Sequence, residues 1–223
     1  MTKVMFFTPI FNFQNPIIAK NHKMIRETCD CEVEYMEVVG ASPENAKSIA
    51  YRKFLESDCD YFFNVDADIF FFDSEGNGVF KGLINPIDFL IACKKDIVGG
   101  IYPFKRPPCQ PSHRPLDLQE MYEKDGKFPE DYKFTIPEGL HEVKWLAGGC
   151  MLISRKVIEN LMKDYLVPNL PMIYKKEYLS EDFAFCQRAR EKGYKIYANS
   201  DIKLGHCGNY YYTLEDYEKY VKK

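Results

Sequence analysis

Two aspartates one residue apart are the strongest chemical signal in this 223-residue sequence. Asp66 and Asp68 follow the apolar run 61–65 directly, and a second apolar run, 69–72, comes after them. Carboxylate oxygens are the hard ligands that Mg²⁺ and Mn²⁺ prefer, and these ions often share them with substrate phosphates. A plain turn is the alternative, because aspartate is a common turn residue. The apolar flanks favour a buried strand that delivers both carboxylates into a cleft.

Two other sites carry groups that could act with this pair. His206 lies in a Gly-His-Cys-Gly segment, 205–208, and the two glycines permit close backbone approach. It is either a further metal ligand or a packed histidine. Glu181 and Asp182 begin a predicted helix after Ser180, where capping alone would explain two carboxylates. A carboxylate held ionised there could instead accept a proton from an attacking hydroxyl.

A glycine pair and an arginine have weaker signals. Gly148 and Gly149 could admit a sugar ring against the backbone, with Trp145 as a stacking face, or they could form a tight strand entry. Arg52 lies on the predicted helix before the Asp-x-Asp strand. It could reach a nucleotide phosphate or base, or be a surface arginine.

Short apolar runs and helix signals predict the elements that position these residues. Strands are predicted at 4–8, 33–39, 60–65, 96–98 and 194–198, and helices after 42, at 154–166 and at 180–193. We expect Pro9 to end the first strand. The first helix should bury one face, which consists of Ala46, Ile49, Ala50 and Phe54.

This alternation of strands and helices predicts an α/β domain with a mainly parallel sheet. Ligands bind such sheets beyond the carboxyl ends of the strands. Thr8-Pro9 and the Asp66–Asp68 segment both fall at such ends. The stretch 103–137 differs, because it holds seven of the thirteen prolines. A loop of that length predicts a functional lid or a disordered segment.

Composition excludes several classes of protein. The length fits one compact domain, 1–223, and a net charge of −3 with a pI near 5.9 argues against nucleic-acid binding. The eight cysteines lack a regular spacing, which favours reduced and mostly buried thiols. No apolar run is long enough for a signal peptide or a membrane span, so we expect a soluble, cytoplasmic protein.

In their order along the chain, these motifs resemble the GT-A glycosyltransferases, a family with a Rossmann-like nucleotide-diphospho-sugar transferase fold. Five segments carry the resemblance, which covers most of the chain: 6–9, 61–68, 96–100, 145–153 and 180–182 with 205–206. It implies a nucleotide-sugar-binding half at about 1–100 and an acceptor and catalytic half at about 140–223.

The resemblance also implies a role for each matched position. Asp66, Asp68 and His206 would hold Mn²⁺ or Mg²⁺. Asp182 would be the catalytic base, with Glu181 as the second choice. The nucleotide-sugar donor would lie against Thr8, Pro9, Arg52, Val65, Asp66, Ala67, Gly148 and Gly149.

The implied reaction moves a sugar from a UDP-sugar, or next a GDP-sugar, to a hydroxyl of a glycan or glycoprotein, with inversion. The chain also looks like glycosyltransferase domains encoded by large DNA viruses, which would place it in the host cytoplasm. Three other hypotheses stay open. A phosphohydrolase of the haloacid-dehalogenase type uses Asp-x-Asp, although Phe70 stands where a small polar or β-branched residue is usual. The others are a non-catalytic nucleotide-sugar or glycan-binding module and a nucleotidyltransferase, which would need a glycine-rich phosphate loop.

Overall fold

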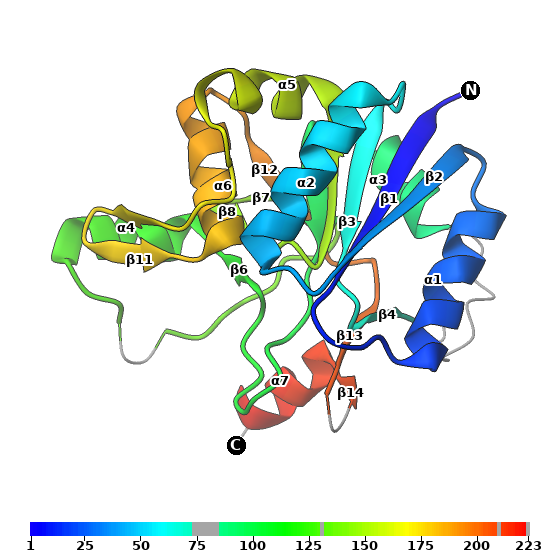
Figure 1. Ribbon diagram of the computed structural model, residues 1–223. Helices are drawn as coiled ribbons and strands as arrows, with labels where there is room; N and C mark the ends of the chain where they lie inside the picture. Colours follow the sequence, from blue (N-terminus) through cyan, green and yellow to red (C-terminus); the bar gives the residue numbers. More distant parts are fainter. Residues whose placement is uncertain (73–84, 130–131, 209–210, 222–223) are drawn as a thin grey trace.

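A seven-stranded sheet forms the centre of the computed structural model, which describes residues 1–72, 85–129, 132–208 and 211–221 (Figure 1). Its strand order is β2-β1-β3-β9-β5-β12-β7. In that order the strands span Glu32–Val39, Lys3–Ile10, Tyr61–Val65, Cys150–Ser154, Ile97–Gly100, Ile196–Asn199 and Leu140–Val143. Five of these strands run in one direction, and only β9 and β7 oppose them. The predicted mainly parallel α/β sheet is confirmed.

Helices cover both faces of this sheet, because successive side chains of a strand point to opposite sides. Met5 and Phe7 of β1 pack into one buried cluster with α2, α5 and α6, whereas Val4 and Phe6 pack into a second cluster with α1 and α3 (Figure 1). In chain order, α1 to α7 span Pro16–Thr28, Pro43–Glu56, Pro86–Ala92, Leu116–Asp125, Arg155–Asp164, Glu181–Glu191 and Leu214–Val221.

Three small antiparallel sheets accompany the central one. In the first, β13 pairs with both β4 and β14, and its register places His206 opposite Ile69. In the other two, β6 pairs with β8 and β10 pairs with β11. From β4 onward, these strands span Ile69–Phe71, His113–Arg114, Trp145–Leu146, Met172–Tyr174, Glu177–Leu179, Leu204–Cys207 and Tyr211–Tyr212. The pairing of β13 with β4 brings the end of the chain to the Asp-x-Asp segment.

Two local predictions are wrong. Pro9 does not end the first strand, because β1 continues to Ile10. The β3 pairing covers only residues 4–7 of β1, so Pro9 lacks a neighbour on that side and its missing N–H costs no hydrogen bond there. Ile49 is 43% exposed, because the buried face of α2 is turned toward Lys47 and Tyr51.

The proline-rich region, predicted as a lid or a disordered segment, contains regular structure. It forms β6 and α4, and α4 ends at Gly126 in the left-handed conformation that glycine tolerates. Residues 130–131 of this region lie outside the described residues.

A third wrong expectation is Trp145 as a stacking face: its side chain is fully buried, and Nε1 donates to Gln187 Oε1.

All eight cysteines are free thiols. Four of them are buried, namely Cys59, Cys109, Cys150 and Cys186, and the others are half-buried. Among the residues that the structure describes, no helix is both long and apolar enough to cross a membrane.

Candidate active site

Asp66 follows the last residue of β3, the buried Val65, at the carboxyl edge of the central sheet. Its backbone N–H donates to the Gly149 carbonyl over 3.1 Å, and its Oδ1 accepts from Asn64 Nδ2 at the same distance. Burial raises the pKa of Asp66 to about 6; the Lys47 ammonium opposes this shift, and the Asp182 and Asp68 carboxylates add to it. The sheet therefore holds this carboxylate in a partly dry, negatively charged environment.

Asp68 lies where β4 and β13 meet, since its carbonyl accepts from Cys207 N over 2.7 Å. Its carboxylate contacts Lys105 Nζ, and its Oδ1 lies 3.4 Å from His206 Nε2. Burial would raise the pKa of Asp68, but hydrogen bonds from His206 and Lys105 outweigh burial and lower it to about 2. The predicted meeting of Asp68 and His206 is therefore present in the structure.

Asp182 stands in the first turn of α6, and its carboxylate is close enough to Asp66 to raise the pKa of that residue. Its Oδ2 accepts the Gly148 N–H over 2.7 Å, and its Oδ1 pairs with the Lys47 ammonium. A methyl group on Gly148 would come within 2.4 Å of the Asp182 carboxylate, and one on Gly149 within 2.6 Å of the Tyr102 hydroxyl. The glycine pair thus lets the backbone approach Asp182 and Tyr102 closely.

Lys47 is a site residue that the sequence reasoning missed. Its side chain is 3% exposed, and its Nζ lies 3.8 Å from Glu181 Oε1 in addition to the Asp182 contact. Burial alone would lower its pKa, but Asp182, Asp66 and Glu181 together raise it. A charged residue between Ala46 and Ala50, on the apolar face of a predicted helix, was the signal that could have identified it.

Lys47, Asp66 and Asp68 border one cleft of about 330 Å³, whereas Asp182, His206 and the glycine pair lie next to lining residues and do not line it themselves. Its lining comes from the loop after β1, the start of α2, the Asp-x-Asp turn and the start of α6. The lining residues are Pro9, Phe11, Asn12, Phe13, Ala41, Pro43, Lys47, Asp66, Ala67, Asp68 and Glu181. Phe11 and Phe13, which we did not predict, are 64% and 73% exposed at this cleft.

The structure gathers most predicted site residues, but not all of them. Pro9, Asp66, Ala67 and Asp68 line the cleft. Thr8 and Val65 are fully buried in their strands just behind it. Arg52 is exposed on α2, more than one turn beyond Lys47, and it is not among the cleft-lining residues.

The donor chemistry at Asp68 and His206 fits a divalent cation. His206 Nδ1 lies 2.8 Å from the Pro103 carbonyl, which can only accept, so Nδ1 carries a proton. Nε2 faces the Asp68 carboxylate, and this contact is favourable when either a proton on Nε2, which makes the hydrogen bond described above, or a cation lies between the two atoms. Within the described ranges, no three His, Cys, Asp or Glu side chains form a cluster able to hold a metal ion by themselves.

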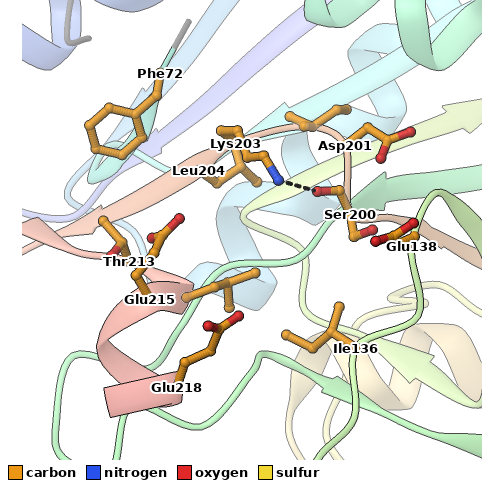
Figure 2. Close-up of a pocket in the computed structure, with 12 residues that line it drawn as sticks. Phe72, Ile136, Glu138, Ser200, Asp201, Lys203, Leu204, Thr213, Glu215 and Glu218 are labelled. Atoms are coloured by element: carbon orange, nitrogen blue, oxygen red, sulfur yellow. Dashed lines mark hydrogen bonds between the residues drawn. The ribbon is translucent and has the colours of Figure 1, made fainter. Parts of the chain in front are cut away.

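A larger cavity lies away from this cleft (Figure 2). It has a volume of about 670 Å³ and lies between the 136–138 segment, the 200–204 turn and the start of α7. Four carboxylates line it, those of Glu138, Asp201, Glu215 and Glu218, and the Lys203 ammonium donates to the Ser200 carbonyl. This acidic lining would repel a diphosphate, and none of the predicted site residues is there.

Comparison with solved structures identifies proteins of similar fold. A197 from STIV matches with a TM-score of 0.59 and 19% identity, over 93% of this chain and 86% of A197. A UDP-glucose pyrophosphorylase in complex with UDP-glucose matches with a TM-score of 0.49 and 13% identity, over 100% of both chains. A 4-diphosphocytidyl-2C-methyl-D-erythritol synthase from Anaerococcus prevotii DSM 20548 matches with a TM-score of 0.44 and 12% identity, over 100% of this chain and 99% of that one. The likeness to A197 shows that this Rossmann-like fold is shared with a viral protein. No model of a known protein family and no curated protein matches the chain.

Proposed function

We propose that this protein is a GT-A-type glycosyltransferase that moves a sugar from a nucleoside-diphosphate sugar, UDP-linked before GDP-linked, to a hydroxyl of a glycan or glycoprotein. The observation that carries the proposal is the convergence of Asp66, Asp68 and Asp182 at the carboxyl edge of one mainly parallel sheet, beside His206. Cofactor and substrate sites of such sheets lie at this edge.

Asp66, Asp68 and His206 would hold Mn²⁺ or Mg²⁺, with further ligands from the donor diphosphate. When bound there, the ion would supply positive charge to offset the negative charge that develops on the departing nucleoside diphosphate. The mixture of carboxylates and an imidazole favours Mn²⁺. Lys105, which shares the Asp68 carboxylate, would lie within reach of the same diphosphate.

Asp182 would act as the general base. A carboxylate has about four acceptor positions, and Lys47 and Gly148 occupy two of them. Its remaining positions can take the proton of the acceptor hydroxyl while the hydroxyl oxygen bonds to the anomeric carbon. The bond from that carbon to the diphosphate breaks on the opposite face, so the configuration of the sugar is inverted.

The test is thermal unfolding with UDP, GDP and their sugar conjugates, each with Mn²⁺ or with EDTA. A ligand at about 100 times its dissociation constant adds about 2.7 kcal/mol to the free energy of unfolding. We expect one nucleotide family to stabilise the protein with Mn²⁺ only, and Asp68→Asn to abolish that gain. Turnover is then measured as release of the free nucleoside diphosphate from the stabilising conjugate.

Asp58→Asn is the matched control, because Asp58 pairs with Lys3 at the surface and does not line the cleft. It should respond to nucleotide as the unaltered protein does. A response without metal dependence would overturn the cation site. Phosphate release from a simple phosphoester, with no nucleotide response, would favour the phosphohydrolase. Metal-dependent binding without turnover in the presence of acceptors would favour a binding module.

A further inference from the structure

Lys105 reaches from the loop after β5 to the Asp-x-Asp turn. Its ammonium contacts Oδ2 of Asp68, and the other oxygen of this carboxylate, Oδ1, lies 3.4 Å from His206 Nε2. Asp68 and His206 are two of the three side chains that we propose as ligands of the divalent cation. An ammonium group of the protein therefore lies on a carboxylate that the cation would use.

The loop that carries Lys105 is fixed at its base. Pro103 forms a β-bridge with Pro111. The Phe104 N–H donates to the Gln110 carbonyl over 2.9 Å. A lysine ammonium, in contrast, is carried on a flexible four-carbon stem. The Lys105 ammonium can therefore change its partner while the backbone of the loop stays in place.

The ion pair of Lys105 with Asp68 is open to solvent. Its two side chains are 36% and 39% exposed. The side chains of the Lys47–Asp182 pair are only 3% and 12% exposed. Exposed ion pairs contribute little free energy, so a competing charge can break them easily. Lys105 is therefore a cation that can leave its carboxylate, whereas Lys47 is a fixed one.

A divalent cation and the Lys105 ammonium compete for the same carboxylate. With both of them at Asp68, two positively charged groups would repel each other at short range. A diphosphate removes this conflict, because its oxygens accept hydrogen bonds from an ammonium and are also ligands for Mn²⁺ or Mg²⁺. Asp68 and the diphosphate are thus alternative partners for Lys105.

We propose that Lys105 makes cation binding depend on the nucleotide, because it occupies Asp68 until a nucleoside diphosphate draws its ammonium away. This inference rests on the cation and donor sites proposed above. The cation then binds weakly alone and more tightly with the diphosphate. By thermodynamic reciprocity, the cation increases the affinity for the nucleotide by the same factor.

The experiment is a titration of the full-length chain with Mn²⁺ at constant ionic strength, with and without saturating UDP, in which electron paramagnetic resonance measures free Mn²⁺. Mn²⁺ held by UDP in solution is measured without protein and subtracted. Lys105→Met should bind Mn²⁺ without UDP about fivefold more tightly than the unaltered protein, the effect of losing one exposed competing ion pair. With UDP, the two proteins should bind Mn²⁺ about equally. The factor by which UDP tightens Mn²⁺ binding should therefore fall about fivefold in Lys105→Met.

Two control variants separate this effect from a general change of charge. Lys156→Met removes an exposed lysine that pairs with Asp96, and neither residue lines the cleft. Because salt screens distant charges, it should change the Mn²⁺ affinity by less than about twofold. Lys105→Arg keeps the positive charge and should keep most of the dependence on UDP. Thermal unfolding verifies the fold of each variant.

Two outcomes would overturn the inference. One is Mn²⁺ binding without UDP that Lys105→Met leaves unchanged or weakens, and the other is an unchanged effect of UDP on Mn²⁺ affinity in that variant. Failure of the proposed function gives a different result. If UDP does not tighten Mn²⁺ binding by the unaltered protein, the donor site is contradicted, and the titration without UDP still decides whether Lys105 competes for Asp68. Absence of Mn²⁺ binding in the unaltered protein and in every variant contradicts the cation site itself.

Discussion

Lys47 shows how a single residue can organise the candidate site. Its ammonium is almost fully buried, with Asp182 in contact and Glu181 and Asp66 nearby. Removing one partner of a buried ion pair is costly, because the other charges stay buried without compensation. The same ammonium fixes the Asp182 carboxylate against the Gly148 N–H. The residue therefore contributes both to stability and to the position of the proposed base.

We predict that Lys47→Met lowers the free energy of unfolding by about 3–5 kcal/mol, since three carboxylates then lack their cation. Urea unfolding at pH 7.5 measures this change. Lys53→Met is the matched control on the same helix, because its pair with Glu56 is exposed at 61% and 66% and should contribute little to stability. Equal losses in the two variants would contradict the role of Lys47.

The sequence signals of the candidate-site carboxylates and the signal of Lys47 differ in kind. Asp66, Asp68 and Asp182 could be predicted because their types and positions, after a strand or at the start of a helix, favour ligand chemistry. The contact of Gly148 with Asp182 could not be predicted. It depends on a tertiary approach between α6 and the turn before β9, and the spacing of 34 residues does not encode it.

At the scale of elements, α1 is joined to the Asp-x-Asp region through β4. His22 of α1 is buried; its Nε2 lies 2.7 Å from the Ile69 carbonyl, and its Nδ1 lies 3.1 Å from Gln14 Nε2. The carbonyl requires a proton on Nε2, so Nδ1 accepts and the ring is neutral. Burial lowers the pKa of His22 to about 4. The helix is thus held on β4 by a group that has to stay uncharged.

This contact predicts a loss of stability in acid. The unfolded chain takes up a proton on His22 below about pH 6.5, whereas the folded protein resists until about pH 4. Stability from the neutral ring is therefore complete above pH 6.5 and declines as the pH falls through this window. By pH 5, His22 should have removed about 2 kcal/mol from the free energy of unfolding.

His22→Gln isolates this effect, because the amide can still donate to Ile69 but does not titrate. Urea unfolding of both proteins at pH 7.5 and pH 5 gives the comparison. The variant should lose about 2 kcal/mol less than the unaltered protein over this interval. The same loss in both would show that His22 is already protonated in the folded state.

Elements with strong apolar periodicity were predicted, and those with weak patterns were missed. The strands at 33–39 and 60–65 correspond closely to β2 and β3. In contrast, α1 was not predicted because half of its residues are polar, although Asn15, which caps Ile17 N, and Pro16 mark its start. The prolines around α4 led us to expect a loop there, although Gly126 marks the end of a helix. Tertiary packing, which a local pattern does not report, stabilises both.

At the scale of the whole molecule, β9 joins the two halves of the sheet. It is hydrogen-bonded to β3 on one side and to β5 on the other, and it is antiparallel to both. The strands of the first hundred residues therefore do not form one continuous sheet until residues 150–154 are inserted between them. The buried side chains of β9, among them Met151 and Leu152, belong to the clusters on both faces.

We therefore predict that a fragment of residues 1–137 lacks a cooperative thermal transition, because both β3 and β5 lose their shared partner. Circular dichroism on heating measures this. Co-expression with a second fragment, 138–223, should restore a cooperative transition, since the cut lies between the exposed Pro137 and Glu138. A cooperative transition in the first fragment alone would show that the N-terminal half folds independently.

The central place of β9 also determines when the complete sheet can form during translation. At translation speeds of about 5–20 residues per second, about 3–10 seconds separate the appearance of β5 from that of β9. During this interval β3 and β5 each present an open edge to the ribosome surface and to other chains. Codon choice between residues 100 and 154, and the supply of chaperones that shield strand edges, should therefore govern how much of this protein escapes aggregation in an expressing cell.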